Sequence, residues 1–290
     1  MKKNNLYGII IALIAVLIIS PDTLFMIWGD MPAFQMVAWR GILAGLCYLV
    51  IWIISTRSLI KKDFANLFSN WGITIFLCYF INTILFCIGI SIAPAPVVLF
   101  CIATAPIFAA IFGQLILLEP ANKTTWITIF LVMIGISIAI WGSNTQEINF
   151  DVFIILGALC GLGSAITIAL SFVKVREKKD LPFVLPMGLG VFISGVVGLF
   201  VTQYENMMSG NVLPIAITGI FVLPIPMYLL SYASRYTRAT NVSLILLLES
   251  VLGPLWIWLG TGDQPSSLTL LGGFVVIFST GSYLLISKQN

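Results

Sequence analysis

Apolar and polar positions along this chain fall into long alternating blocks. Ten apolar blocks, separated by short polar segments, run through the 290 residues. Each block is about 20 residues long, the length that a helix needs to cross ~30 Å of hydrocarbon at 1.5 Å per residue. The pattern therefore predicts an all-α polytopic membrane protein with ten transmembrane helices. The predicted spans are residues 6–28, 32–55, 70–90, 95–118, 123–141, 151–173, 183–202, 213–234, 238–260 and 267–287.

The composition supports this class. Hydrophobic residues make up 60% of the chain and charged residues 9%, whereas about a quarter of the residues in a soluble domain are charged. The loops between spans are at most about fifteen residues long, which leaves no room for a soluble catalytic domain. The net charge is only +3, and no basic stretch is suited to nucleic acid, so we expect no nucleic-acid partner.

The basic residues outside the spans indicate how the chain crosses the membrane. None of the loops that follow odd-numbered spans contains Lys or Arg. By the positive-inside rule both termini are then cytoplasmic, in a multi-pass protein of a bacterial inner membrane. We expect the first span to be retained, because the Ser20-Pro21-Asp22 segment that follows its apolar run is not an Ala-x-Ala cleavage site. The basic residues outside the spans are Lys2, Lys3, Arg57, Lys61, Lys62, Lys123, Lys174, Arg176, Lys178, Lys179, Arg235, Arg238 and Lys288.

The two halves of the chain have the same hydropathy pattern. A shift of 144 residues places span four on span nine and span five on span ten, and it places Glu119 on Asp263. Each half contains five spans, so the second half enters the membrane in the opposite sense to the first. We therefore predict two inverted repeats, residues 1–145 and 146–290, an architecture found in many secondary transporters.

Two segments resemble the signature of a known family. Residues 105–110 (Ala-Pro-Ile-Phe-Ala-Ala) and 117–120 (Leu-Leu-Glu-Pro) are similar to the first-half signature of the drug/metabolite transporter superfamily, in its EamA-type branch. A second copy runs from Glu249 to Asp263 with the same spacing. The family's usual proline after the glutamate is here Ser250, and Pro254 follows one turn later, so we expect the kink of this helix to be displaced. The resemblance implies ten helices around a central cavity and alternating access by rocking of the two halves.

Three charged residues within the spans are candidates for contact with a substrate, because charge inside a membrane is costly and is normally turned toward a cavity or a partner. Asp22 and Arg40 lie at similar depth on spans one and two. They form either a structural ion pair, or a pair in which Arg40 meets a substrate carboxylate or exchanges partners. Glu249 lies near the middle of span nine. It acts as a proton carrier, as a receptor for a substrate amine, or as a protonated group bonded between helices.

Two further acids end the fourth and ninth helices, where a carboxylate opposes the helix dipole. These are Glu119 and Asp263. We expect both to be structural and to have local partners, with Lys123 as a partner of Glu119.

Aromatic residues and prolines supply further candidates. Five side chains either line a cavity or only pack between helices: Trp39, Tyr79, Asn82, Tyr228 and Tyr232. Four prolines mark helices that can bend between inward-open and outward-open states: Pro21, Pro106, Pro226 and Pro254. Gly41 with Gly45, and Gly157 with Gly161, form GxxxG pairs that permit close helix crossing.

No motif of an enzyme or of a metal or cofactor site is found in the sequence. The chain has no histidine and no P-loop, and its five cysteines fall inside spans without CxxC spacing. We therefore expect a secondary transporter of a small organic metabolite rather than an enzyme. Two carboxylates and one guanidinium suit a zwitterion or a cation better than an anion. An amino acid or other zwitterion is the preferred class and export is the preferred direction, with or without proton coupling. The alternatives are uptake of a cationic amine or osmolyte, and a lipid-handling protein without transport. The expected partners are the substrate, membrane lipids and protons, and the chain is expected to be a monomer or a homodimer.

Overall fold

The structure is a computed structural model that describes residues 2–55, 60–143, 152–202, 207–262 and 264–289. All regular secondary structure in these ranges is helical. Ten helical segments are long and apolar enough to cross a membrane, and they coincide with the ten predicted spans. The predicted all-α class with ten transmembrane helices is thus confirmed.

Six spans are single helices and four are interrupted. The single helices are α3 (Ala33–Ser55), α5 (Asn70–Ile92), α8 (Lys123–Ser143), α9 (Val152–Glu177), α10 (Val184–Thr202) and α15 (Ser267–Gln289). The interrupted spans are α1 (Lys2–Ile19) with α2 (Asp22–Gly29), α6 (Ala95–Ile102) with α7 (Ala105–Leu117), α11 (Val212–Ile217) with the π-helical turn η2 (Thr218–Val222) and α12 (Pro224–Ala233), and α13 (Ala239–Leu246) with α14 (Glu249–Thr261). A short amphipathic helix that the hydropathy pattern did not predict, α4 (Ile60–Leu67), connects spans two and three.

The first span breaks at a proline. Pro21 has no N–H, so the Leu17 carbonyl loses its helical partner. The Ser20 hydroxyl replaces that partner by donating to the Leu17 oxygen at 2.9 Å. Trp256 of α14 donates in turn to the Ser20 hydroxyl oxygen at 2.8 Å. The break is therefore both satisfied within the chain and tied to the ninth span.

The fourth and ninth spans break at equivalent positions. Each boundary of α6 and α7 is separated by 144 residues from the matching boundary of α13 and α14. The same hydrogen bond closes both breaks: Thr104 N–H donates to the Cys101 oxygen at 3.1 Å, and Leu248 N–H to the Ile245 oxygen at 3.0 Å. The expected displacement of the second kink is wrong. Pro254 lies inside α14 without interrupting it, because the break is made by backbone bonds to the third preceding carbonyl and requires no proline.

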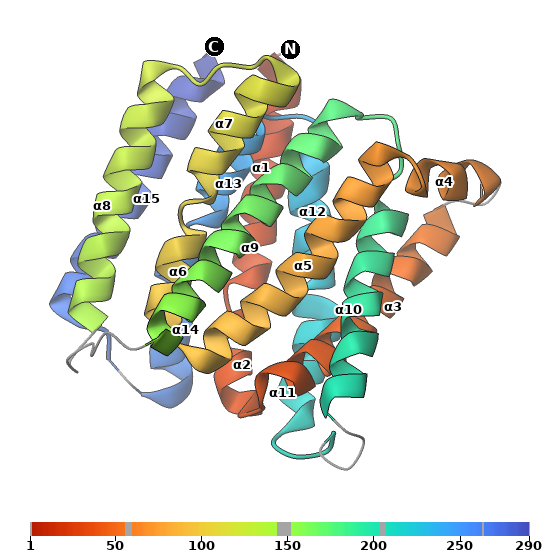
Figure 1. Ribbon diagram of the computed structural model, residues 1–290. Coiled ribbons are helices and arrows are strands. Elements are labelled where there is room, and N and C mark those ends of the chain that lie inside the picture. Colours follow the sequence, from red (N-terminus) through yellow and green to blue (C-terminus); the bar gives the residue numbers. More distant parts are fainter. Residues whose placement is uncertain (1, 56–59, 144–151, 203–206, 263, 290) are drawn as a thin grey trace.

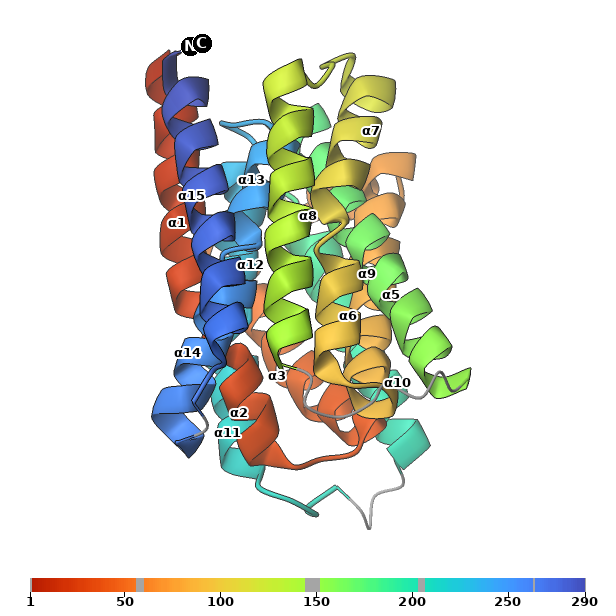
Figure 2. The ribbon, with the colours of Figure 1, turned by 90° about the vertical axis from the view of Figure 1, so that its left-hand side faces the viewer.

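Glycines set the closest helix crossings. A Cβ atom on Gly41 of α3 would lie 2.5 Å from the Gly195 Cα atom of α10, and one on Gly157 of α9 would lie 2.2 Å from the Ala93 Cβ atom. Both GxxxG pairs therefore mark close contacts, as predicted. Helices α8 and α15 pack together along the side of the bundle that Figure 2 turns toward the viewer.

The two ends of the bundle differ in which connections they carry. Helix α1 begins and α15 ends at the same end, which we call the terminal end (Figure 1). The connection from α2 to α3 and residues 207–211, which precede α11, lie at the opposite end, which we call the distal end (Figures 1 and 2).

Candidate functional site

Asp22 and Arg40 form a buried ion pair. Arg40 on α3 donates from Nη1 to Asp22 Oδ1 at 3.0 Å and from Nη2 to Asp22 Oδ2 at 2.8 Å. The two side chains are only 3% and 4% exposed. Asp22 is the first residue of α2, so the break at Pro21 places the carboxylate at a helix N-terminus, where the dipole stabilises negative charge. The sequence left open whether Arg40 faces Asp22, and the structure places them together in a bidentate pair.

Glu249 completes a group of three charges. It is the first residue of α14, which packs against α2, and it interacts electrostatically with Asp22 and Arg40. From the sequence alone, no basic residue is expected at the same membrane depth as Glu249. The fold places Arg40 close enough to interact with it. Among the described residues, no ion-pair partner lies within bonding distance of the Glu249 carboxylate. A partly buried acid thus stands beside an arginine whose guanidinium is held by another acid.

Tyr79 and Asn82 line a cavity between α5, α9 and α12. The Tyr79 hydroxyl lies 2.5 Å from the Ser231 hydroxyl, and Asn82 donates to the Ser164 carbonyl and the Thr167 hydroxyl, each at 3.3 Å. The free space is about 10 Å³, enough for about one water molecule. A metabolite enters this region only if the helices separate.

Trp39 lies apart from the tyrosines and closes the distal end. Its indole N–H donates to the Met207 carbonyl at 2.8 Å. One turn earlier, the fully buried Gln35 donates to the same oxygen at 3.1 Å and to the Ser209 carbonyl at 2.6 Å. We call these four residues the distal closure. Sequence reasoning missed Gln35, although an amide one turn from Trp39 in an apolar span is a signal of this contact.

Tyr228 and Tyr232 stack on one face of α12, with ring centroids 6.0 Å apart. Tyr228 also stacks on Phe183 at 5.5 Å. These rings lie in the same apolar cluster as Tyr79, whereas Trp39 packs in another. The five aromatic and amide candidates therefore belong to different parts of the bundle.

The four candidate hinge prolines occupy different positions relative to the helix breaks. Pro21 lies in the break between α1 and α2, and Pro106 is the second residue of α7 directly after a break. Pro226 is the third residue of α12, which follows the π-helical turn, and Pro254 is interior to α14.

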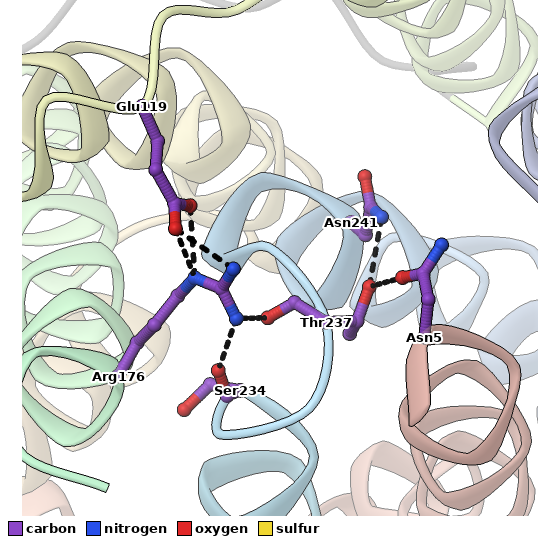
Figure 3. A network of polar contacts seen from close by, with 6 residues as sticks. All are labelled: Asn5, Glu119, Arg176, Ser234, Thr237 and Asn241. Atoms are coloured by element: carbon purple, nitrogen blue, oxygen red, sulfur yellow. Dashed lines mark hydrogen bonds and ion pairs between the residues drawn. The ribbon is translucent and has the colours of Figure 1, made fainter. Parts of the chain in front are cut away.

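A polar network closes the terminal end (Figure 3). Arg176, at the end of α9, donates to Glu119 from Nε at 2.9 Å and from Nη2 at 2.8 Å. Its Nη1 donates to the carbonyls of Thr237 at 2.6 Å and Ser234 at 3.2 Å. The expectation that Lys123 pairs with Glu119 is wrong: the exposed lysine is close in sequence, but α9 brings a guanidinium with matching fork geometry to the carboxylate.

The same network reaches the first and last spans. The Thr237 hydroxyl donates to the Asn5 side-chain oxygen at 2.6 Å and accepts from Asn241 at 2.8 Å. Tyr283 of α15 donates to the Asn241 oxygen at 2.8 Å. We call the contacts from Glu119 to Tyr283 the terminal closure. Asp263, the second acid predicted to end a helix, lies outside the described residues.

In the described part of the chain, no group of three or more His, Cys, Asp and Glu side chains could hold a metal ion.

Comparisons with known proteins bear on the family and the fold. The model of the EamA-like transporter family matches residues 6–141 and 155–285. The uncharacterized transporter YdfC of Bacillus subtilis is 26% identical over 227 residues, which cover 74% of this chain and 71% of YdfC. The UDP-N-acetylglucosamine transporters of Mus musculus and Bos taurus are each 23% identical over 195 residues, covering 60% of this chain and 58% of theirs. A solved crystal structure covers 98% of this chain and 99% of its own with a TM-score of 0.77 at 13% identity, a likeness of fold alone.

Proposed function

The chain belongs to the EamA-like transporter family, and we propose that it carries a small zwitterionic metabolite, with amino acids as the preferred class and export as the preferred direction. The family and the relatives have names of transporters rather than enzymes. It is a multi-pass membrane protein that acts on a small molecule.

The observation that carries the proposal is the group of Asp22, Arg40 and Glu249. These residues come from spans one, two and nine, and thus from both matched regions of the family model. Charge buried in a membrane is retained where it serves a pathway or a substrate. A site shared by the two halves changes its contacts when the halves move, which alternating access requires.

The signs of the three charges favour a zwitterion. Glu249 is free to accept an ammonium group, while Arg40 offers a guanidinium suited to a carboxylate. A substrate carboxylate would compete with Asp22 for Arg40, so binding would loosen the contact between α2 and α3. Glu249 or the released Asp22 would then be available to carry a proton, which is the route we propose for any proton coupling.

Two polar closures support alternating access. The distal closure and the terminal closure lie at opposite ends of the bundle (Figure 1). The cavity of Tyr79 holds about one water molecule, so we propose that the closures open in turn.

Equivalent boundaries support two inverted repeats, residues 1–145 and 146–290. The breaks in spans four and nine coincide under the shift of 144 residues. Helix neighbours also match: α5 packs on α9 as α12 packs on α1, which are spans three and six against spans eight and one. We propose that these halves rock against each other.

The orientation that we propose has the terminal end in the cytoplasm of a bacterial cell. It rests on the basic residues of the even-to-odd loops and is supported by the common position of the first and last helices (Figure 1).

A second candidate substrate class comes from the relatives. Similarity to the UDP-N-acetylglucosamine transporters favours a nucleotide sugar. Against it, the charged group contains two carboxylates and one guanidinium, whereas a diphosphate calls for several facing Lys or Arg side chains. The cationic-amine alternative is weakened by Trp39, which packs away from Tyr228 and Tyr232 and is bonded to the distal backbone.

The test is ligand-dependent thermal stabilisation of the purified protein, followed by transport in proteoliposomes. Amino acids, amines, nucleotide sugars and organic acids are compared on the wild type, Arg40→Ala and Glu249→Gln. Glu177→Gln, which removes an exposed charge at the end of α9, is the matched control.

We expect a zwitterion to stabilise the wild type and Glu177→Gln but neither site variant, and to be transported only by the first two. Stabilisation by a nucleotide sugar would support the second class. Hits that are indifferent to both site variants, or stabilisation by lipids alone, would overturn the proposal.

A further inference from the structure

Aromatic rings form a continuous series where α12 approaches the terminal end. Tyr228, Tyr232 and Tyr236 recur every four residues, so they share one face of the helix and of the turn that follows it. Their successive centroids lie 6.0 and 5.2 Å apart. Phe183 extends the series at one end at 5.5 Å, and Tyr7 of α1 at the other at 5.0 Å. We call these five residues the aromatic ladder.

Arg235 lies against the aromatic ladder. Its guanidinium carbon is 4.7 Å from the Phe183 centroid and 5.8 Å from the Tyr232 centroid. Nη2 donates to the Leu181 carbonyl. The buried Nε atom has no hydrogen-bond partner, and within the part of the chain that the structure describes no carboxylate forms an ion pair with this guanidinium.

This environment differs from that of Arg40 and Arg176, each of which donates at least two hydrogen bonds to one carboxylate. Burial lowers the pKa of Arg235, opposed by nearby tyrosines and Asp180, and arginine stays protonated at neutral pH. Asp180 acts on Arg235 only through this longer-range interaction, and a partly desolvated positive charge that no carboxylate in the described ranges pairs with attracts an anion. Arg235 therefore has unused capacity for an anionic ligand.

The aromatic ladder leads toward the interior cavity. Tyr228 and Tyr232 pack against the apolar cluster that contains Tyr79. Met227, one residue before Tyr228, lines the cavity together with Tyr79 and Asn82. A ligand bound at Arg235 would thus stand at the start of a path into the bundle, a position that suits a substrate better than a lipid held at the periphery.

We propose that Arg235 and the aromatic ladder form a binding site for the carboxylate of a small substrate that also carries an aromatic ring. The edge of a guanidinium binds a carboxylate through two parallel hydrogen bonds, and the tyrosine rings offer faces for stacking. The inference rests on the proposed function: the site is the terminal-end subsite of the transport path, occupied before or after Arg40.

Binding of matched probes tests the site without relying on transport. The purified protein in phosphatidylcholine nanodiscs is titrated with phenylpropionate, with phenylpropanol, which lacks the carboxylate, and with butyrate, which lacks the ring. Arg235→Gln and Arg235→Lys are compared with Lys179→Gln, which removes an exposed charge from the connection before α10. The nanodisc experiment is repeated with phosphatidylglycerol added.

Arg235→Gln is expected to weaken phenylpropionate binding at least about tenfold, the loss typical of a charge-assisted hydrogen bond, and to leave phenylpropanol unchanged. Arg235→Lys retains the charge but loses the fork, so its binding is expected to be intermediate. Butyrate binds more weakly than phenylpropionate, and Lys179→Gln stays within about twofold of the wild type.

Three results would overturn the site: no phenylpropionate binding by the wild type, equal binding by Arg235→Gln, or Arg235-dependent binding of phosphatidylglycerol without such binding of the acid. Acid binding through Arg235 by a protein that moves no zwitterion in proteoliposomes would instead overturn the proposed function and leave this site in place. Transport of a zwitterion without Arg235-dependent acid binding would overturn this site alone.

Discussion

The buried pair of Asp22 and Arg40 is held by two short hydrogen bonds at almost complete burial. Each charge is tolerated only because the other is present. The contribution of the pair to the free energy of unfolding therefore has to be measured by removing each partner alone and both together.

We predict that Asp22→Asn destabilises the protein by about 3–5 kcal/mol, because it leaves a buried guanidinium without its counter-ion. The double variant Asp22→Leu/Arg40→Met is expected to recover most of that loss, since both partners of the buried ion pair are removed together. Thermal unfolding in detergent measures both. A single variant as stable as the wild type, or a double variant less stable than the single, would contradict this account.

Residue-scale predictions from sequence succeed when depth in the membrane limits the choice. Asp22 and Arg40 are charges at similar depth on adjacent spans, and they do pair. Depth gave no help for Glu119: Lys123 is four residues away, but the partner is Arg176, separated by 57 residues. That contact depends on how α7 and α9 cross, which hydropathy does not encode.

At the scale of elements, the close crossing of α3 and α10 depends on glycines, which have no side chain. We predict that Gly41→Ala destabilises the protein by about 1–3 kcal/mol, the usual cost of overpacking, because the new Cβ atom would lie 2.5 Å from the backbone of Gly195. Gly281→Ala in α15 is the control: nothing lies within 4 Å of its Cβ position, so the variant should be neutral or slightly stabilising. Thermal unfolding that ranks the two variants in the opposite order would contradict the crossing.

The helix breaks give a second prediction at this scale. Ser250→Pro removes two hydrogen bonds to the Leu247 carbonyl, one from the Ser250 N–H at 3.1 Å and one from the Ser250 hydroxyl at 2.6 Å. The equivalent Pro106 is accommodated in the matching break. We expect a cost of about 1–2 kcal/mol, that of two hydrogen bonds to one carbonyl.

Leu259→Pro is the matched control for this substitution, since its side chain is 76% exposed and little packing is lost. In the interior of α14 a proline is expected to cost about 3 kcal/mol or more. Equal losses in thermal stability and in folded yield would show that the second break differs from the first.

The number and the approximate bounds of the spans were predictable from the sequence, because an apolar block of about 20 residues is enough to identify a transmembrane helix. The breaks within spans were only partly predictable. Pro21 marks one, but the break at Leu247 and Leu248 has no proline. It became visible only as backbone hydrogen bonds that repeat those of the first half.

At the scale of the whole molecule, we predict that each closure controls access to the cavity of Tyr79 from its own end of the bundle. Ser171 is buried and lines the cavity with Tyr79 and Asn82, so a cysteine there reports whether the path is open. The background would carry Ala or Ser at Cys47, Cys78, Cys87, Cys101 and Cys160, all of which are free thiols.

Glu119→Gln weakens the bidentate contact with Arg176, so we predict faster modification of Ser171→Cys by an impermeant thiol reagent from the side of the terminal end only. Gln35→Ala removes three hydrogen bonds of the distal closure and should raise reactivity from the side of the distal end only. Lys123→Gln, which changes an exposed charge near Glu119, should raise neither. Opening one closure favours the state in which the other stays shut, because a carrier that opened both at once would leak. Reactivity that rises from both sides in either variant would therefore argue against alternating access between these two closures.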